Sequence, residues 1–181
     1  PSQESAPGLT EEGHRALRSL EGLSHRRRAH CRASGLSSVA AWRAAMTRFV
    51  LDTDTCIFWL KGNRGIDRRI HLVGIESVSI SVITACELAY GAWKSQRRED
   101  NLRVLERLQR TLPTLHTTDP VIQRFGHWKA ELEGKGAGLD DADLLIASIA
   151  LAHECTLVTN NQAHFARLPH LTIENWLVPP V

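Results

Sequence analysis

Several features that mark specialised classes of protein are missing from this sequence of 181 residues. No uninterrupted apolar run approaches the ~18 residues that a transmembrane helix needs. The first residues lack the basic and apolar segments of a secretory signal peptide. No two cysteines form a Cys-x-x-Cys pair, so we interpret all four as reduced, buried thiols. These absences favour a cytoplasmic protein with no membrane contact. The cysteines are Cys31, Cys56, Cys86 and Cys155.

Methionine is almost absent as well, because Met46 is the only one in the chain. Before it, residues 1–45 carry seven arginines and four glutamates. The rest of the chain carries 15 basic and 16 acidic residues and is therefore nearly neutral. We predict that natural translation starts at Met46 and that residues 1–45 are a disordered or non-native N-terminal extension. Residues 46–181 would then form one domain.

Two other interpretations of the extension remain open. Residues 10–23 could form an amphipathic helix that begins at Thr10 and carries three leucines on one side. Residues 26–28 are three consecutive arginines, which could bind nucleic acid. The leucines are Leu17, Leu20 and Leu23.

After Met46, short apolar segments alternate with segments of helical periodicity. This alternation predicts an α/β fold in a single domain, with a parallel sheet covered by helices on both faces. We expect strands at residues 47–52, 77–81, 114–118, 156–159 and 171–176. We expect helices at residues 53–62, 82–95, 97–112, 119–136 and 140–155, and a short helix or turn at residues 63–74.

The first predicted strand ends in acidic residues, in the stretch FVLDTDTC. Asp52 follows only apolar residues, where a carboxylate is costly unless a cation satisfies it or it caps the next helix. Asp54 could serve a site or act as that cap. Glu87 lies in an otherwise apolar helical segment, where a glutamate is seldom buried unpaired. Ligands bind at the carboxyl ends of strands in such sheets, so these acids are candidate site residues.

A second acidic cluster opens the last long helix. The helix macrodipole favours negative charge there and explains Asp140 and Asp141. Asp143 faces another direction and precedes an apolar run, so it joins the candidates. If Asp52, Glu87 and Asp143 converge, their charges repel one another unless a hard cation such as Mg²⁺ or Mn²⁺ is bound. Such ions suit the hydrolysis of phosphodiesters.

The opening stretch also resembles the first motif of haloacid dehalogenase phosphatases, in which the first Asp is a nucleophile and the second an acid/base. Cys56 stands where that motif expects a threonine. In addition, the acidic cluster LDDAD comes before the threonine-ended strand LVT, which is the wrong order for that class. A phosphatase of this class is therefore the weaker alternative.

Four segments, in the right order, resemble the VapC toxins, which are ribonucleases with a PIN domain. FVLDTDTCI (49–57) resembles the opening LDTN segment, and SVITACELAYGAWKS (81–95) resembles the strand-to-helix segment with a glutamate. GLDDADLLIASIALA (138–152) resembles the acidic helix, and TLVTNNQAHFARLPHLTIENW (156–176) resembles the closing TNNxxxF segment and its following strand. The resemblance covers nearly all of the chain after Met46 and implies a PIN-like three-layer α/β/α fold.

The resemblance implies that Asp52, Glu87 and Asp143 are the catalytic, metal-binding acids of an endoribonuclease that uses Mg²⁺, with Mn²⁺ as the other option. The fourth acid of the family has no carboxylate counterpart in TNNQAHF. Two residues occupy the positions where it would lie, and two more could assist the site. These possible accessory residues are Asn161, His164, Thr159 and Asp54.

The resemblance also implies partners. It implies an RNA substrate, tRNA or rRNA, whose cleavage arrests translation, and a homodimer. It implies a VapB-type antitoxin that inserts a side chain into the acidic site. The basic pairs at residues 68–69 and 97–98 could contact the RNA backbone. The alternative to an enzyme is a catalytically inactive PIN scaffold that binds RNA or the antitoxin. Residues expected to line the antitoxin groove are Trp59, Leu60, Tyr90 and Trp93.

Overall fold

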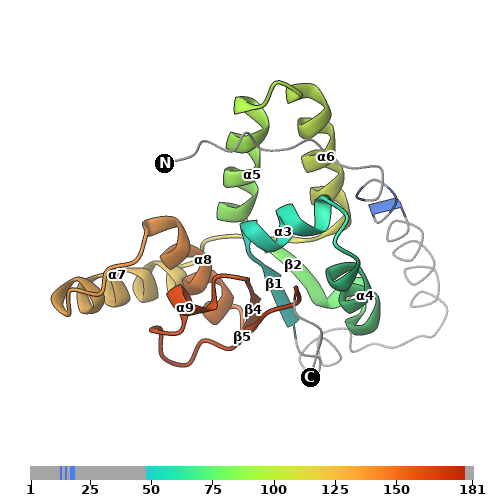
Figure 1. Ribbon diagram of the computed structural model, residues 1–181. Helices are drawn as coiled ribbons and strands as arrows, with labels where there is room; N and C mark the ends of the chain where they lie inside the picture. Colours follow the sequence, from blue (N-terminus) through green and yellow to red (C-terminus); the bar gives the residue numbers. More distant parts are fainter. Residues whose placement is uncertain (1–12, 14, 16, 19–47, 178–181) are drawn as a thin grey trace.

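The structure is a computed structural model that describes residues 13, 15, 17, 18 and 48–177 (Figure 1). Its strands are β1 (Arg48–Leu51), β2 (Val78–Ser81), β3 (Thr114–Leu115), β4 (Cys155–Val158) and β5 (Ile173–Glu174). From β1 onward its helices are α3 (Thr53–Leu60), α4 (Arg64–Val73), the 3-10 helix η1 (Ile75–Ser77), α5 (Val82–Lys94), α6 (Arg98–Thr111), α7 (Asp119–Gly134), α8 (Asp141–Ala152) and α9 (Gln162–Phe165).

The five described strands form a parallel sheet in the order β3-β2-β1-β4-β5. In its register, Leu51 of β1 lies opposite both Ile80 of β2 and Val158 of β4. The three central strands therefore end at the same level. Asp52 and Thr159, the first residues beyond β1 and β4, lie side by side at the carboxyl edge of the sheet.

The side chains of β1 alternate between two hydrophobic clusters, as expected for a strand that is covered on both faces. Phe49 and Leu51 belong to a cluster with residues of α3, α4, α5 and α6. Val50 belongs to a second cluster with residues of α7 and α8. Helices lie on both sides of the sheet in Figure 1, so the predicted three-layer α/β/α arrangement is confirmed. Large, fully buried members of the two clusters include Trp59, Ile66, Ile70 and Leu108 in the first, and Leu144, Ile146 and Phe165 in the second.

Several helices begin at a polar side chain that accepts a hydrogen bond from the first turn of the helix. Such a cap satisfies an N–H group that has no partner within the helix. Two of these caps, Asp52 and Ser81, are also residues at the carboxyl ends of strands. The starts of α3 and α5 are thereby fixed at the carboxyl edge of the sheet. The four caps are Asp52 for α3, Asn63 for α4, Ser81 for α5 and Asp140 for α8.

The predicted order of strands and helices is confirmed, and the differences concern short segments. The strands expected at residues 114–118 and 171–176 shrink to the two-residue strands β3 and β5. Both lie at the edges of the sheet, where a strand has a partner on one side only. The segment left as a helix or turn forms the ten-residue helix α4, which ends at Gly74 with φ of 86°. The short helices η1 and α9 were not predicted.

Most of the N-terminal extension lies outside the described residues. This applies to Met46, to the arginines at residues 26–28 and to Cys31. Of the helix considered for residues 10–23, four residues are described, and all four are helical. Leu17 is one of them, and its side chain is fully buried in the cluster that also contains Phe49 and Leu51.

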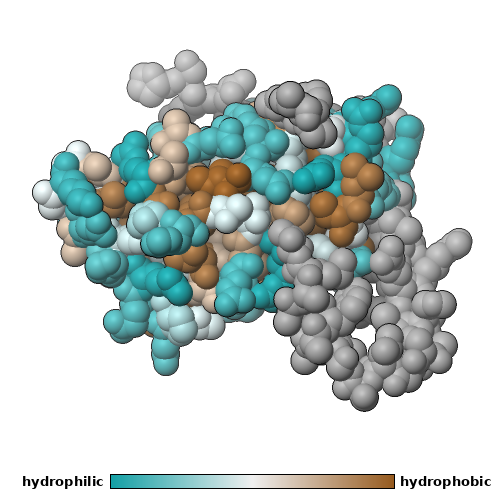
Figure 2. All heavy atoms as spheres, turned by 90° about the horizontal axis from the view of Figure 1, so that it is seen from below, coloured by the Kyte–Doolittle hydropathy of each residue, from teal (hydrophilic) through white to brown (hydrophobic). Residues whose placement is uncertain are grey.

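The surface of the described part mixes polar and apolar side chains. Seen from below, apolar residues reach the surface in separate patches between hydrophilic ones (Figure 2). No helix of the described residues is long and apolar enough to cross a bilayer. Cys56 and Cys155 are buried as expected, but the prediction was wrong for Cys86, which lies on an exposed side of α5.

Candidate active site

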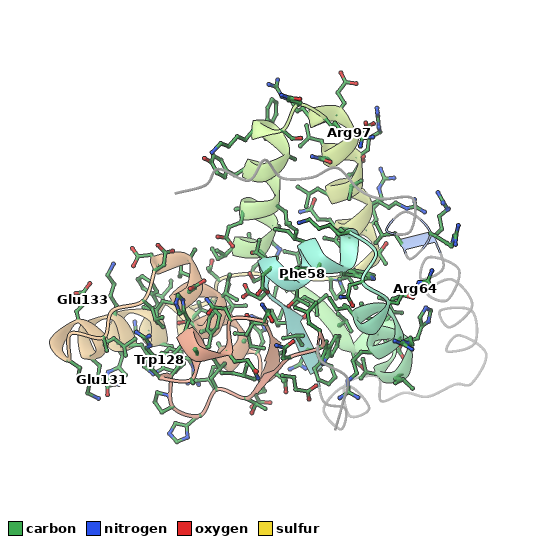
Figure 3. The ribbon with its side chains drawn as sticks, in the orientation of Figure 1. Phe58, Arg64, Arg97, Trp128, Glu131 and Glu133 are labelled. Atoms are coloured by element: carbon green, nitrogen blue, oxygen red, sulfur yellow. The ribbon has the colours of Figure 1, made fainter. Side chains whose placement is uncertain are left out.

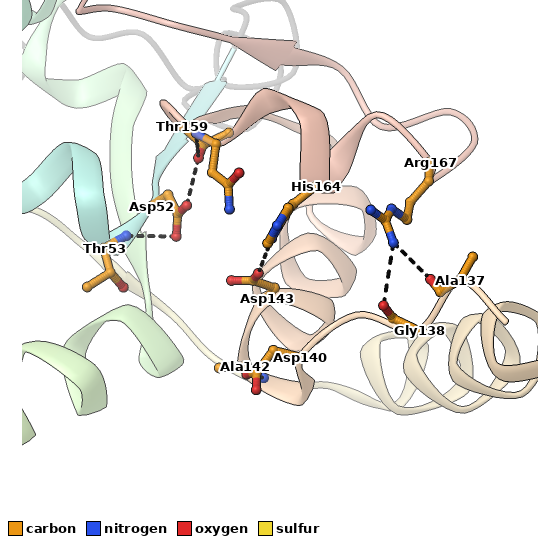
Figure 4. A network of polar contacts seen from close by, with 11 residues as sticks. Asp52, Thr53, Ala137, Gly138, Asp140, Ala142, Asp143, Thr159, His164 and Arg167 are labelled. Atoms are coloured by element: carbon orange, nitrogen blue, oxygen red, sulfur yellow. Dashed lines mark hydrogen bonds and ion pairs between the residues drawn. The ribbon is translucent and has the colours of Figure 1, made fainter. Parts of the chain in front are cut away.

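The order of strands reverses next to β1. The chain moves from β1 to β2 on one side and later returns to the other side of β1 as β4. A crevice at the carboxyl ends of the strands forms at such a reversal and is the usual ligand site of α/β sheets. Asp52 and Thr159 meet there. The hydroxyl of Thr159 donates a hydrogen bond to Oδ2 of Asp52 at 2.8 Å (Figure 4).

Asp52 is buried, and both of its carboxylate oxygens accept hydrogen bonds. Oδ1 accepts from the backbone N–H of Thr53 at 2.7 Å, so Asp52 also serves as the cap of α3. Burial nevertheless raises the pKa of Asp52 from 3.8 to about 7. The hydrogen bonds from Thr159 and Thr53 lower this pKa, and the charges of Asp54 and Asp143 raise it. Without a cation nearby, Asp52 is therefore partly protonated at neutral pH.

Asp54 lies in the first turn of α3 but does not cap it. Its Oδ2 accepts a hydrogen bond from the backbone N–H of Asn160 at 3.1 Å, and its Oδ1 accepts one from the hydroxyl of Thr55 at 3.1 Å. Burial raises the pKa of Asp54, and the charge of Asp143 adds to the effect. Asp54 thus ties α3 to the segment that follows β4 and contributes negative charge to the crevice.

Glu87 reaches the same region from the other side of β1. It lies on α5 and is half-buried, and its Oε2 accepts a hydrogen bond from the hydroxyl of Thr53 at 2.5 Å. Thr53 follows Asp52 directly, so its backbone contacts one candidate acid and its side chain contacts another. Glu87 is also on the wall of a half-open pocket of about 90 Å³ between α3, α5 and α6.

Of the three aspartates at the start of α8, only Asp143 turns toward the crevice. Asp140 accepts a hydrogen bond from the N–H of Ala142 and caps the helix. Asp141 forms an ion pair with Lys129 of α7 at 2.6 Å. Asp143 is half-buried, and its Oδ2 lies 3.4 Å from Nδ1 of His164 on α9 (Figure 4). Asp140 therefore acts at the start of the helix, as expected. Asp141 is instead held by an ion pair with another helix.

The oxygen atoms of this crevice suit a hard divalent cation. Mg²⁺ and Mn²⁺ prefer carboxylate oxygens, and no described ion pair joins a lysine or arginine to Asp52, Glu87 or Asp143. Burial, and to a lesser extent the charges of Asp54 and Asp143, raise the pKa of Asp52, and such a cation would offset both effects. Within the described residues, however, no three His, Cys, Asp or Glu side chains are already grouped closely enough to hold a metal. Binding would have to draw the carboxylates together.

Comparison with known proteins identifies this architecture. The sequence profile of the PIN domain matches residues 49–171, a range that contains all the candidate site residues. The chain belongs to the PIN domain family. This membership excludes the alternative suggested by the opening stretch, a phosphatase of the haloacid dehalogenase class.

Relatives within the PIN family are VapC proteins. Ribonuclease VapC2 of Rickettsia felis is 36% identical over 132 residues, which are 71% of this chain and 97% of that protein. The tRNA(fMet)-specific endonuclease VapC of Salmonella typhimurium is 37% identical over 131 residues, which are 72% of this chain and 99% of that protein. A solved VapBC complex from Salmonella typhimurium, bound to DNA, covers 72% of this chain and 99% of its own, with 39% identity and a TM-score of 0.68.

Sequence reasoning missed two contributors to this PIN-domain site. Thr53 orients Glu87, although a threonine at a helix start reads as an ordinary cap residue. The backbone of Asn160 holds Asp54, a role that a sequence pattern does not reveal. The only signal for Thr53 was its place between two aspartates. Asn161 donates its backbone N–H to Thr159, while its side chain has no described hydrogen bond, so its accessory role stays a prediction.

The expected groove residues are divided between three environments. Leu60 lines the pocket between α3, α5 and α6. Trp59 is buried in the core, and its indole N–H donates to Asp67 at 3.4 Å. Tyr90 and Trp93 are exposed on α5 and do not line that pocket. The prediction was therefore wrong for Trp59, which is buried in the core, and it stays a prediction for Leu60, Tyr90 and Trp93.

Proposed function

We propose that this chain is a metal-dependent endoribonuclease, the toxin of a type II toxin–antitoxin pair, and that it arrests translation by cleaving tRNA or rRNA. The observation that carries the proposal is a buried carboxylate, Asp52, at the strand reversal of a PIN domain, with Asp54 and Asp143 close enough to raise its pKa. The ribonuclease and endonuclease names of the VapC relatives support the choice of RNA as substrate.

In this proposal Asp52, Glu87 and Asp143 hold a divalent cation, Mg²⁺ or Mn²⁺. When bound, the cation supplies Lewis-acid polarisation of the phosphodiester and activation of water for its hydrolysis. The neighbouring side chains position these acids. Thr159 and the N–H of Thr53 fix the two oxygens of Asp52, and the hydroxyl of Thr53 fixes Glu87.

Three accessory roles complete the proposed site. His164 holds the carboxylate of Asp143 and stands in the segment where the family has its fourth acid. Asn161 is held to Thr159 through its backbone N–H, and in this proposal its side-chain amide serves the crevice. Asp54 adds negative charge beside Asp52. Each of these residues adjusts the charge or orientation of the three main acids.

The proposed partners follow from the family and from the pocket. The VapBC complexes among the related structures support a VapB-type antitoxin as partner. The pocket between α3, α5 and α6 is mainly apolar and carries Glu87 on its wall, so an apolar helix with one basic side chain would fit it. We also propose a homodimer that acts in the cytoplasm.

One observation favours a second candidate function, a catalytically inactive PIN scaffold that binds RNA or the antitoxin. The described acids are not grouped closely enough to hold a metal as they stand, and TNNQAHF has no carboxylate. This scaffold would bind its partners through the same surfaces and would not cut RNA.

The deciding experiment is cleavage of total RNA by the purified chain in Mg²⁺, in Mn²⁺ and in chelator. We expect discrete fragments that require the metal and that disappear in Asp52→Asn and in Asp143→Asn. Asp140→Asn is the matched control, because asparagine caps a helix as well as aspartate does and Asp140 faces solvent. Cleavage retained by either site variant would refute the assigned roles. Divalent-metal binding without cleavage of any RNA would favour the scaffold.

A further inference from the structure

Two large aromatic side chains of α5 are left on the surface. Tyr90 is 66% exposed and Trp93 is 58% exposed. Neither belongs to the two hydrophobic clusters of the described residues. Aromatic residues make up only 6% of the sequence, so two of them in one exposed turn of helix are not explained by folding. Exposed aromatic side chains of this kind are typical of binding surfaces.

Each aromatic ring is accompanied by a cation. Nζ of Lys94 lies 5.6 Å from the centre of the Tyr90 ring, and the guanidinium carbon of Arg98 lies 5.1 Å from the Trp93 ring. Three of these residues lie on α5, and Arg98 is the first residue of α6. Together they form what we call the α5 strip: Tyr90, Trp93, Lys94 and Arg98.

The positive charge of the α5 strip is not neutralised by the carboxylates around it. Asp100 forms ion pairs with Arg97 and Arg103, and Arg103 also pairs with Glu99. Among the described ion pairs, none involves Lys94 or Arg98. These two cations therefore remain available to the phosphates of a nucleic acid.

The α5 strip begins at the candidate active site. Glu87, Tyr90 and Lys94 are spaced at three and seven residues, which places them along one side of the helix. The seven residues from Glu87 to Lys94 correspond to about 10 Å along the helix axis. Helix α5 leads away from the sheet in Figure 1, and Arg97 marks the outer end of the α5–α6 hairpin in Figure 3. The α5 strip thus extends from the acidic site, at Glu87, toward the outer end of the α5–α6 hairpin.

We propose that the α5 strip binds single-stranded RNA beside the bond that the acidic site cuts, an inference that rests on the proposed ribonuclease function. Bases stack on aromatic side chains without strong sequence preference, and nearby cations hold the phosphates. The domain is nearly neutral and its crevice is acidic, so it needs a local source of positive charge to hold RNA. An apolar protein segment fits the pocket beside the strip better, which Leu88 and Ala92 line and which does not include Tyr90 or Trp93.

Binding without cleavage tests the strip separately from the active site. The probe is a fluorescein-labelled single-stranded RNA oligonucleotide of mixed sequence, titrated with the full chain in chelator and followed by fluorescence anisotropy. Trp93→Ala should weaken binding about tenfold, the scale of one lost base–aromatic stack. Trp93→Phe keeps an aromatic face and should retain most of the affinity. Lys94→Gln combined with Arg98→Gln should make the negative slope of log K against log salt shallower by about 1.4, since each phosphate contact contributes about −0.7 for single strands.

The matched control is the double variant Ile122→Ala, Arg124→Gln on α7. Ile122 is 58% exposed, like Trp93, and Arg124 is an exposed cation near it in the sequence. We expect this control to bind the probe as the unchanged chain does. Equal affinity of Trp93→Ala and the unchanged chain would overturn the proposal, and so would the absence of any RNA binding by the unchanged chain.

Two further outcomes separate this proposal from its alternatives. If the strip variants bind RNA normally but change the elution volume in size-exclusion chromatography, the surface is an interface between copies of the chain and the RNA proposal is wrong. If Asp52→Asn still cuts RNA, the proposed active site is wrong whatever the strip variants do. Normal cleavage with a raised KM in Trp93→Ala would support the strip, because its residues would then act in binding.

Discussion

The proposed role of Asp52 and its environment favour different protonation states. It must stay at the crevice as a carboxylate, yet burial and the charges of Asp54 and Asp143 favour its protonated form. With a folded-state pKa of about 7 against an ordinary 3.8, the folded chain binds more protons than the unfolded chain between these two pH values. The free energy of unfolding of the metal-free protein therefore falls as the pH rises from about 4 to about 7.

The variant Asp52→Asn should remove this pH dependence. At pH 8 in chelator we expect it to be more stable than the unchanged chain by about 2 kcal/mol, because the charge that burial disfavours is gone. At pH 4 the two should be equally stable, since Asp52 is then protonated. Urea denaturation at pH 4, 6 and 8 measures the difference. Parallel pH profiles for the two proteins would show that the pKa of Asp52 is not raised.

The identity of residue 164 should influence whether the site prefers Mn²⁺ or Mg²⁺. Imidazole is a softer ligand than a carboxylate and favours Mn²⁺ over Mg²⁺, and Nδ1 of His164 lies 3.4 Å from Asp143. His164→Glu should therefore lower the ratio of the cleavage rate in Mn²⁺ to that in Mg²⁺ severalfold. The same substitution at the exposed His127 of α7 is the control and should leave the ratio unchanged. An unchanged ratio in His164→Glu would exclude His164 from the metal site.

Helix α5 supplies Glu87, and its starting point is set by one buried residue. Oγ of Ser81 accepts a hydrogen bond from the N–H of Thr84 at 2.9 Å and lies 2.9 Å from the hydroxyl of Thr84. That hydroxyl also donates to the carbonyl of Leu51, which directly precedes Asp52. The cap of α5 is thereby connected to the end of β1, and the relative position of Glu87 and Asp52 depends on it.

Ser81→Ala should lower the free energy of unfolding by about 1 kcal/mol through loss of this cap. We also expect weaker binding of Mn²⁺, because the start of α5 would no longer be fixed against β1. Chemical denaturation and calorimetric titration with Mn²⁺ measure the two effects. Ser95→Ala at the exposed end of α5 is the control, and water can replace the hydrogen bond that Ser95 makes there. Equal effects at both ends would contradict the special role of the buried cap.

The elements that could be predicted are those with a clear period. The inner strands and the long helices follow the pattern of their apolar residues, which is why their order and approximate bounds agree with the prediction. Helix α9 has four residues, too few for a period to show, although it carries His164. The exposure of Tyr90 and Trp93 on α5 could not be predicted for a different reason. Periodicity predicts that Tyr90 and Trp93 are helical, but not which neighbouring element covers them.

At the scale of the whole molecule, the N-terminal extension contacts the domain through Leu17, which is buried in the first cluster. Both clusters and all candidate site residues come from residues 48–177, apart from Leu17. We therefore expect residues 46–181 to fold and to cut RNA as the full chain does. Removal of residues 1–45 should lower the free energy of unfolding by about 2 kcal/mol, the contribution of one buried leucine. Chemical denaturation of both chains and of Leu17→Ala in the full chain measures this contribution. A shortened chain of full stability would show that the extension does not pack on the domain.

The sequence by itself determined the α/β class, the order of the elements and the family, because these depend on local periodicity and on motifs of neighbouring residues. It also singled out the candidate acids, since a carboxylate after an apolar strand or within an apolar helix is conspicuous. Only the tertiary structure decided which of them meet. Thr159 reaches Asp52 across 107 residues of sequence because β4 pairs with β1, and Asp141 is drawn away by Lys129. Burial then sets the pKa of Asp52, and burial is a property of the packed molecule.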